Sequence, residues 1–102
     1  MQTARKFAST SVISDLKEMC GDRFQLLSPQ LRSVLLVTFS QFQLLKRMQV
    51  SGSSHLLMRE AIASVPILCW LEQQGLQLEV TRCCVLNDAE VGHIIQLLAE
   101  NL

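Results

Sequence analysis

The fold expected of this chain is decided by the stretch Leu76-Gln77-Leu78-Glu79-Val80-Thr81, in which apolar and polar side chains alternate. A two-residue period is typical of a strand that buries one face and exposes the other. Gly75, directly before the stretch, fits the position that ends a preceding helix. The sequence therefore predicts a strand that begins at Leu76 and ends near Thr81.

The residues after this strand predict a helix. Asn87 followed by Glu90 has the pattern of a capping box, in which each side chain bonds the backbone amide of the other residue. Apolar residues then recur every three or four positions, at Val91, Ile94, Ile95 and Leu98. We expect this last helix to run from about Asp88 to Asn101.

The residues before the strand predict further helices. Ser28 followed by Pro29 is a start signal, because the hydroxyl caps free amides and proline fits the first helical turn. We expect one helix over 11–20 closed by Gly21, one from 28 to a point between 41 and 48, and one from 53 or 54 to Gln74 with a kink at Pro66.

A repeated unit is suggested by a shift of 30 residues, which places Met48 on Leu78 and Val50 on Val80. This indicates a strand-turn-helix unit that occurs twice. We expect a flexible N-terminus over 1–10 and a single domain over 11–102, helical over 11–47 and built of two β-α units over 48–102. The expected fold class is α/β, with strands paired in parallel through crossover helices. The alternative is an all-α bundle in which 76–86 is an extended loop and the helix from 28 to 48 packs between the others.

The second unit carries Leu78, Val80, Cys83, Val85, Asp88, Val91, Ile94, Leu98 and Asn101. This pattern resembles a leucine-rich repeat of the ribonuclease-inhibitor type, which also ends many NOD-like receptors of innate immunity. The resemblance, mainly over 76–102, implies that Cys83 turns the chain toward a helix. It also implies a concave sheet surface that a partner contacts, formed by Gln77, Glu79, Thr81 and Arg82. Because about three such units are normally needed for stability, a helical cap, further repeats or a second copy must complete the core.

Charge and hydropathy limit the partners. Nine Lys and Arg balance nine Asp and Glu, so no net field draws the chain toward nucleic acid or an anionic membrane. The longest apolar stretches, 34–37 and 65–71, are shorter than the roughly 20 residues that cross a bilayer. We expect a protein partner, with neither nucleic acid nor membrane, and leave self-association open. Because no secretory signal is present, we expect a cytoplasmic or nuclear protein, with a mitochondrial address at the basic start as the alternative.

The main candidates for chemistry are four cysteines and two histidines, which are Cys20, Cys69, Cys83, Cys84, His55 and His93. Their spacing lacks the short CxxC or HxxxH steps of structural zinc sites, so we expect neither a metal nor a cofactor. The thiols are expected to be reduced and mostly buried. The sequence favours a non-catalytic protein-interaction module, an adaptor or subunit of a larger intracellular assembly. The alternative is a small cysteine-dependent or redox enzyme that uses Cys83 or Cys84.

Overall fold

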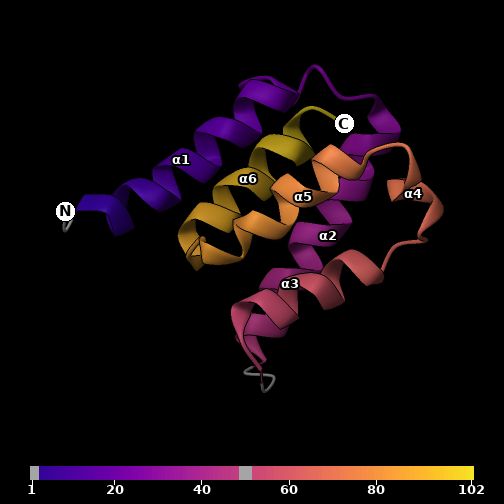
Figure 1. Ribbon diagram of the computed structural model, residues 1–102. Coiled ribbons are helices and arrows are strands. Elements are labelled where there is room, and N and C mark those ends of the chain that lie inside the picture. Colours follow the sequence, from indigo (N-terminus) through magenta and orange to yellow (C-terminus); the bar gives the residue numbers. More distant parts are fainter. Residues whose placement is uncertain (1–2, 49–51) are drawn as a thin grey trace.

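The computed structural model describes residues 3–48 and 52–102, and within these ranges the secondary structure consists of helices (Figure 1). They are α1 Thr3–Cys20, α2 Pro29–Arg47, α3 Ser54–Ala63, α4 Leu68–Leu71, α5 Gln74–Arg82, the 3-10 turn η1 Cys83–Val85, and α6 Asp88–Glu100. No strand occurs in the described residues. The chain is therefore a small all-α structure, as the alternative fold predicted, and the α/β prediction is wrong.

The predicted strand at 76–81 is part of α5. Leu76 and Val80 are buried, but Leu78 is 68% exposed. A spacing of four residues puts Leu76 and Val80 on the same face of a helix as well as on the same face of a strand. Leu78 distinguishes a strand from a helix, because a strand would bury it together with Leu76 and Val80. Its exposure shows that the segment is a helix. The extended loop of the all-α alternative is also wrong at this segment, since α5 and η1 occupy it.

The predicted repeat is also wrong, because it required the strand at 76–81. Met48 forms the C-cap of α2, and residues 49–51, on which the rest of the first predicted strand falls, lie outside the described residues. Without the second strand there is no β-α unit at 76–102. The resemblance to leucine-rich repeats, and the innate-immune role that it implied, are therefore not supported.

Two of the predicted helix starts, after Ser28 and after Asn87, are confirmed by their caps. The Ser28 hydroxyl accepts a hydrogen bond from the amide of Leu31 at 3.2 Å, and α2 starts at Pro29. The capping box of α6 is complete, with the Glu90 amide donating to Asn87 Oδ1 at 2.8 Å and the Asn87 amide donating to Glu90 Oε1 at 2.9 Å. Each cap satisfies amides that the first helical turn leaves without a partner.

Three helix boundaries differ from expectation. The helix expected from residue 11 begins at Thr3. Pro66 does not kink one long helix, because α3 already ends at Ala63 and the chain re-enters a short helix, α4. Gly75 does not end a helix but lies in the first turn of α5. Gly21 does follow α1 as predicted, with a φ of +94° that suits a helix C-terminus.

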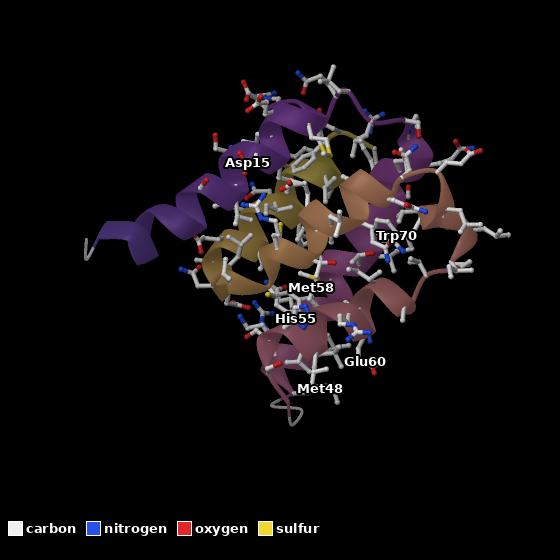
Figure 2. The ribbon with its side chains drawn as sticks, viewed as in Figure 1. Asp15, Met48, His55, Met58, Glu60 and Trp70 are labelled. Atoms are coloured by element: carbon white, nitrogen blue, oxygen red, sulfur yellow. The ribbon has the colours of Figure 1, made fainter. Side chains whose placement is uncertain are left out.

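The helices share one apolar core. α2 packs against α3 and α6, as expected of a helix between others, while α5 packs against α1, α3 and α4 (Figure 1). Figure 2 shows Met58 of α3 among the interior side chains and Glu60 on the outer side of the same helix. The largest fully buried side chains are Phe24, Phe39, Phe42, Leu16, Leu35 and Met58. This packing holds α3 and α5 side by side.

Among the described residues, two ion pairs join helices at the surface. Arg82 of α5 pairs with Asp15 of α1 at 3.1 Å, and Arg47 of α2 pairs with Asp88 of α6 at 3.0 Å. Exposed pairs of this kind contribute little to stability, so the core carries the fold. No helix in the described ranges is both long and apolar enough to span a membrane.

Candidate functional site

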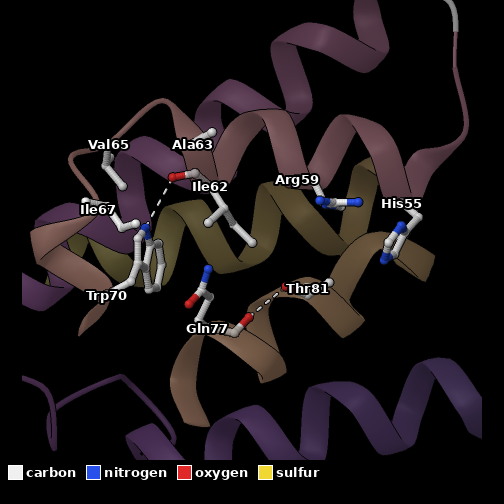
Figure 3. Close-up of a pocket in the computed structure, with 9 residues that line it drawn as sticks. All are labelled: His55, Arg59, Ile62, Ala63, Val65, Ile67, Trp70, Gln77 and Thr81. Atoms are coloured by element: carbon white, nitrogen blue, oxygen red, sulfur yellow. Dashed lines mark hydrogen bonds between the residues drawn. The ribbon is translucent and has the colours of Figure 1, made fainter. Parts of the chain in front are cut away.

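A cleft of about 430 Å³ lies between α3 and α5 (Figure 3). Its lining consists of His55, Arg59, Ile62, Ala63, Val65, Ile67, Trp70, Gln77 and Thr81. The volume falls within the range of roughly 300–1,000 Å³ that is common for ligand clefts.

Helical periodicity brings the lining residues together. The four from α3 are separated by four, three and one positions, so they form one stripe along that helix: His55, Arg59, Ile62 and Ala63. Gln77 and Thr81, four positions apart, form the facing stripe on α5. The Thr81 hydroxyl donates to the Gln77 carbonyl at 2.8 Å, so its hydrogen is already used within α5, although its oxygen can still accept. The Gln77 side-chain amide is then the hydrogen-bond donor that this wall presents to a ligand.

One end of the cleft is apolar. Figure 3 shows Val65, Ile67 and Trp70 gathered there. The Trp70 indole is only 2% exposed, and its Nε1 donates to the backbone carbonyl of Ile62 at 3.2 Å. Ile67, by contrast, is 72% exposed. The apolar wall therefore runs from a fixed, buried ring out to the surface.

The apolar surface continues beyond the cleft along α4. This helix turns Trp70 inward and leaves Leu68 and Leu71 exposed beside Ile67. Single exposed leucines are common on proteins, but neighbouring ones beside a cleft are a feature of interaction surfaces. We call Ile67, Leu68 and Leu71 the α4 rim.

The other end of the cleft is cationic. Figure 3 places the Arg59 guanidinium there, with the His55 ring farther along α3. Within the described residues Arg59 forms no ion pair, and the cleft lining includes no Asp or Glu. Arg59 is also exposed, so its charge is available to a ligand.

The four residues predicted to contact a partner are divided between two faces of α5. Gln77 and Thr81 line the cleft. Glu79 and Arg82 instead point toward α1, where Arg82 Nη1 bonds Glu79 at 3.0 Å and Asp15 at 3.1 Å. The predicted sheet surface is therefore absent from the described part of the chain, although half of its residues lie in the cleft.

Sequence reasoning missed the main lining residues, among them Arg59, Ile62, Ile67 and Trp70. The four-residue spacing of His55 and Arg59 was a usable signal, because it puts both side chains on one face of the predicted helix. The position of Trp70 was not accessible in this way, since it depends on how the chain turns around Pro66.

Three of the four cysteines lie in surroundings that raise their thiol pKa. All four are free thiols, and burial is the main factor that raises the pKa of Cys20 to about 11 and that of Cys83 to about 12, with Glu79 adding to both shifts. Burial likewise raises the pKa of the Cys84 thiol. A nucleophilic cysteine needs a lowered pKa, so these environments oppose thiolate formation. No group of three His, Cys, Asp or Glu side chains gathers in the described ranges in a way that could hold a metal ion.

Comparisons of the chain with protein-family models, with curated proteins and with solved structures found no match. None of them supports the leucine-rich-repeat resemblance.

Proposed function

We propose that this chain is a protein-interaction module that holds a segment of a partner protein in the cleft between α3 and α5. The observation that carries this proposal is the continuity between the cleft and the α4 rim, through Ile67, which belongs to both. Protein interfaces commonly combine a pocket that takes one apolar anchor with a surrounding rim that excludes water. The cleft and the rim provide these two parts.

The fixed position of Trp70 supports the same function. Trp70 is fixed by burial and by its hydrogen bond to Ile62, and α3 and α5 are held by the core. A preformed pocket loses little conformational entropy on binding, which favours affinity. The raised thiol pKa values favour binding over the cysteine-dependent catalysis that the sequence left as an alternative.

Trp70 is the single tryptophan of the chain, so its fluorescence reports on the cleft directly. We would select peptides from a random displayed library on the wild-type chain and titrate the enriched peptides while recording Trp70 emission. We expect saturable changes in emission with a Kd in the micromolar range, which corresponds to a binding free energy of about −8 kcal/mol.

Two matched variants test the location. Ile67→Ser and Leu78→Ser each remove an apolar side chain that is mostly exposed, 72% and 68% respectively, so both variants are expected to fold. Ile67 lines the cleft, whereas Leu78 does not. We expect Ile67→Ser to raise Kd at least 5-fold and Leu78→Ser to leave it unchanged. Equal affinity of both variants, with no change in Trp70 emission on binding, would contradict the proposal.

A further inference from the structure

We infer that the partner segment carries a carboxylate beside its apolar anchor, and that Arg59 binds this carboxylate. The inference rests on the proposed function and names the chemistry of the partner. It follows from the polarity of the cleft, which is apolar around Trp70 and cationic around Arg59 (Figure 3).

Arg59 lies close to an apolar lining residue of its own helix, Ile62, so neighbouring side chains of one peptide can reach both. Ile62 and Arg59 are three positions apart on α3, which separates their Cβ atoms by roughly 5–6 Å. An extended peptide places alternate side chains on one face roughly 7 Å apart, and a helical one places residues three or four apart at about 5–6 Å. An acidic residue can therefore reach Arg59 when it lies within one helical turn of an apolar residue that contacts Ile62, or two positions away from it in an extended segment.

The charge of Arg59 is not neutralised by any carboxylate in the described part of the chain. Arg47 and Arg82 are each engaged with carboxylates, Arg47 with Asp88 and Arg82 with Asp15 and Glu79. Arg59 has no such pair within the described residues, and no acidic side chain lines the cleft. A guanidinium binds a carboxylate through two parallel hydrogen bonds, which gives both energy and orientation. The Gln77 amide on the opposite wall can donate a further hydrogen bond.

The α4 rim identifies the occupant as a peptide. A small amphiphilic acid shares the same two chemical groups and could enter a cleft of about 430 Å³. It would, however, leave the rim residues Leu68 and Leu71 in water. A peptide extends beyond the cleft and can cover them, so it buries more apolar surface.

The test is a set of three parallel peptide selections, on the wild-type chain, on Arg59→Glu and on Arg23→Glu. Arg23 lies in the loop after α1, is exposed and is not part of the cleft lining, so the two variants carry the same change in net charge. Circular dichroism of each variant checks that it is folded. We expect the wild type and Arg23→Glu to enrich one consensus, with an apolar residue and an Asp or Glu at fixed spacing. We expect Arg59→Glu to keep the apolar residue and to replace the acid by Lys or Arg.

A double-mutant cycle measures the contact itself. For an enriched peptide, we expect Arg59→Gln to raise Kd about 10-fold, in the range of a charge-assisted hydrogen bond. Replacing the peptide acid by its amide should have a similar effect on the wild type and little further effect on Arg59→Gln.

The other outcomes separate the two proposals. A consensus that depends on Ile67 but shows no acidic preference, and that is unchanged by Arg59→Glu, overturns this inference and leaves the proposed function standing. Peptides that depend on neither Ile67 nor Trp70, or no enriched peptide at all, overturn both. If no peptide is enriched but octanoate changes Trp70 emission in an Arg59-dependent way, the cleft binds a small amphiphile, and the inference of a peptide ligand is wrong. A wild-type dimer that dissociates on Ile67→Ser assigns the cleft to a second copy of the chain and also overturns it.

Discussion

The indole nitrogen of Trp70 donates a hydrogen bond to the backbone carbonyl of Ile62, with 3.2 Å between Nε1 and O. This bond joins α4 to the last turns of α3 across the break at Pro66. It fixes the ring that forms the apolar end of the cleft, so the stability of the fold and the shape of the cleft are linked through one side chain.

We expect Trp70→Phe to lower the free energy of unfolding by about 1–2 kcal/mol, because it removes one buried hydrogen bond and part of the apolar contact. Trp70→Ala should cost more, about 3–5 kcal/mol, because it leaves a cavity. Urea unfolding followed by circular dichroism measures both. Leu71→Ala is the control, since Leu71 is exposed on the same short helix and should change stability by less than about 0.5 kcal/mol. A Trp70→Phe variant as stable as the wild type would show that the Nε1 bond contributes nothing.

The helical nature of α5 is tested by a second pair, Leu76→Ala and Leu78→Ala. In the helix Leu76 is buried and Leu78 is exposed, so the first change should cost about 2–4 kcal/mol and the second less than about 0.5 kcal/mol. A half-buried strand would bury both side chains on one face and make the two costs similar. Equal losses in urea unfolding would therefore contradict the helix and restore the strand.

Glycine to alanine changes should have opposite signs at two positions. At Gly75 a Cβ atom would meet nothing within 4 Å, and the residue lies in α5, so alanine should stabilise the chain by about 0.5 kcal/mol. At Gly21 the φ of +94° strains any side chain, and a Cβ atom would lie 2.6 Å from the Gln25 side chain. Gly21→Ala should therefore cost about 1–2 kcal/mol, mostly in backbone strain. Thermal unfolding of both variants provides the comparison, and a stabilised Gly21→Ala would contradict the observed turn.

Stability should fall at alkaline pH because of two buried thiols. Burial raises the pKa of Cys20 from 9.0 to about 11 and that of Cys83 from 9.0 to about 12. Below pH 9 both thiols are neutral in the folded and unfolded chain, so their contribution to stability is fully present. Above pH 9 only the unfolded chain ionises, and stability is lost until the pH passes the folded values. The loss is at most about 1.4 kcal/mol per pH unit for each thiol.

Urea unfolding at pH 7.5, 9 and 10 measures this loss. A variant with both Cys20→Ala and Cys83→Ala should be less stable at pH 7.5 but should lose stability more slowly as the pH rises. Parallel losses in the variant and the wild type would mean that other groups cause the alkaline change.

The sequence predicted the starts of α2 and α6 because capping chemistry is local. Ser28 with Pro29, and Asn87 with Glu90, act within one helical turn, so their patterns predict helix starts independently of the tertiary fold. The strand at 76–81 was wrong for a physical reason. Leu76 and Val80 fit both a strand and a helix, and only the exposure of Leu78 shows which of the two is present. Whether Leu78 is buried or exposed depends on packing between helices far apart in the sequence.

The cleft between α3 and α5 was not predicted. Gln77 and Thr81 were named for a sheet surface but line a cleft between helices. Arg59 and Trp70 were missed because the cleft requires α3, α4 and α5 to pack together. Residue patterns can indicate which face of a helix is apolar, but they do not show which two faces leave a space between them.

The packing of α1 has a consequence for synthesis of the chain. Its apolar stripe, which includes Val12, Leu16 and Cys20, is covered by α5 and η1, and these begin only at Gln74. A ribosome adds roughly 5–20 residues per second, so the apolar stripe of α1 stays uncovered for several seconds until α5 has been synthesised. During that time the nascent chain exposes the apolar face of this amphipathic helix to solvent. A chaperone that binds emerging polypeptides could therefore hold α1 at this stage, and its release would coincide with the arrival of α5.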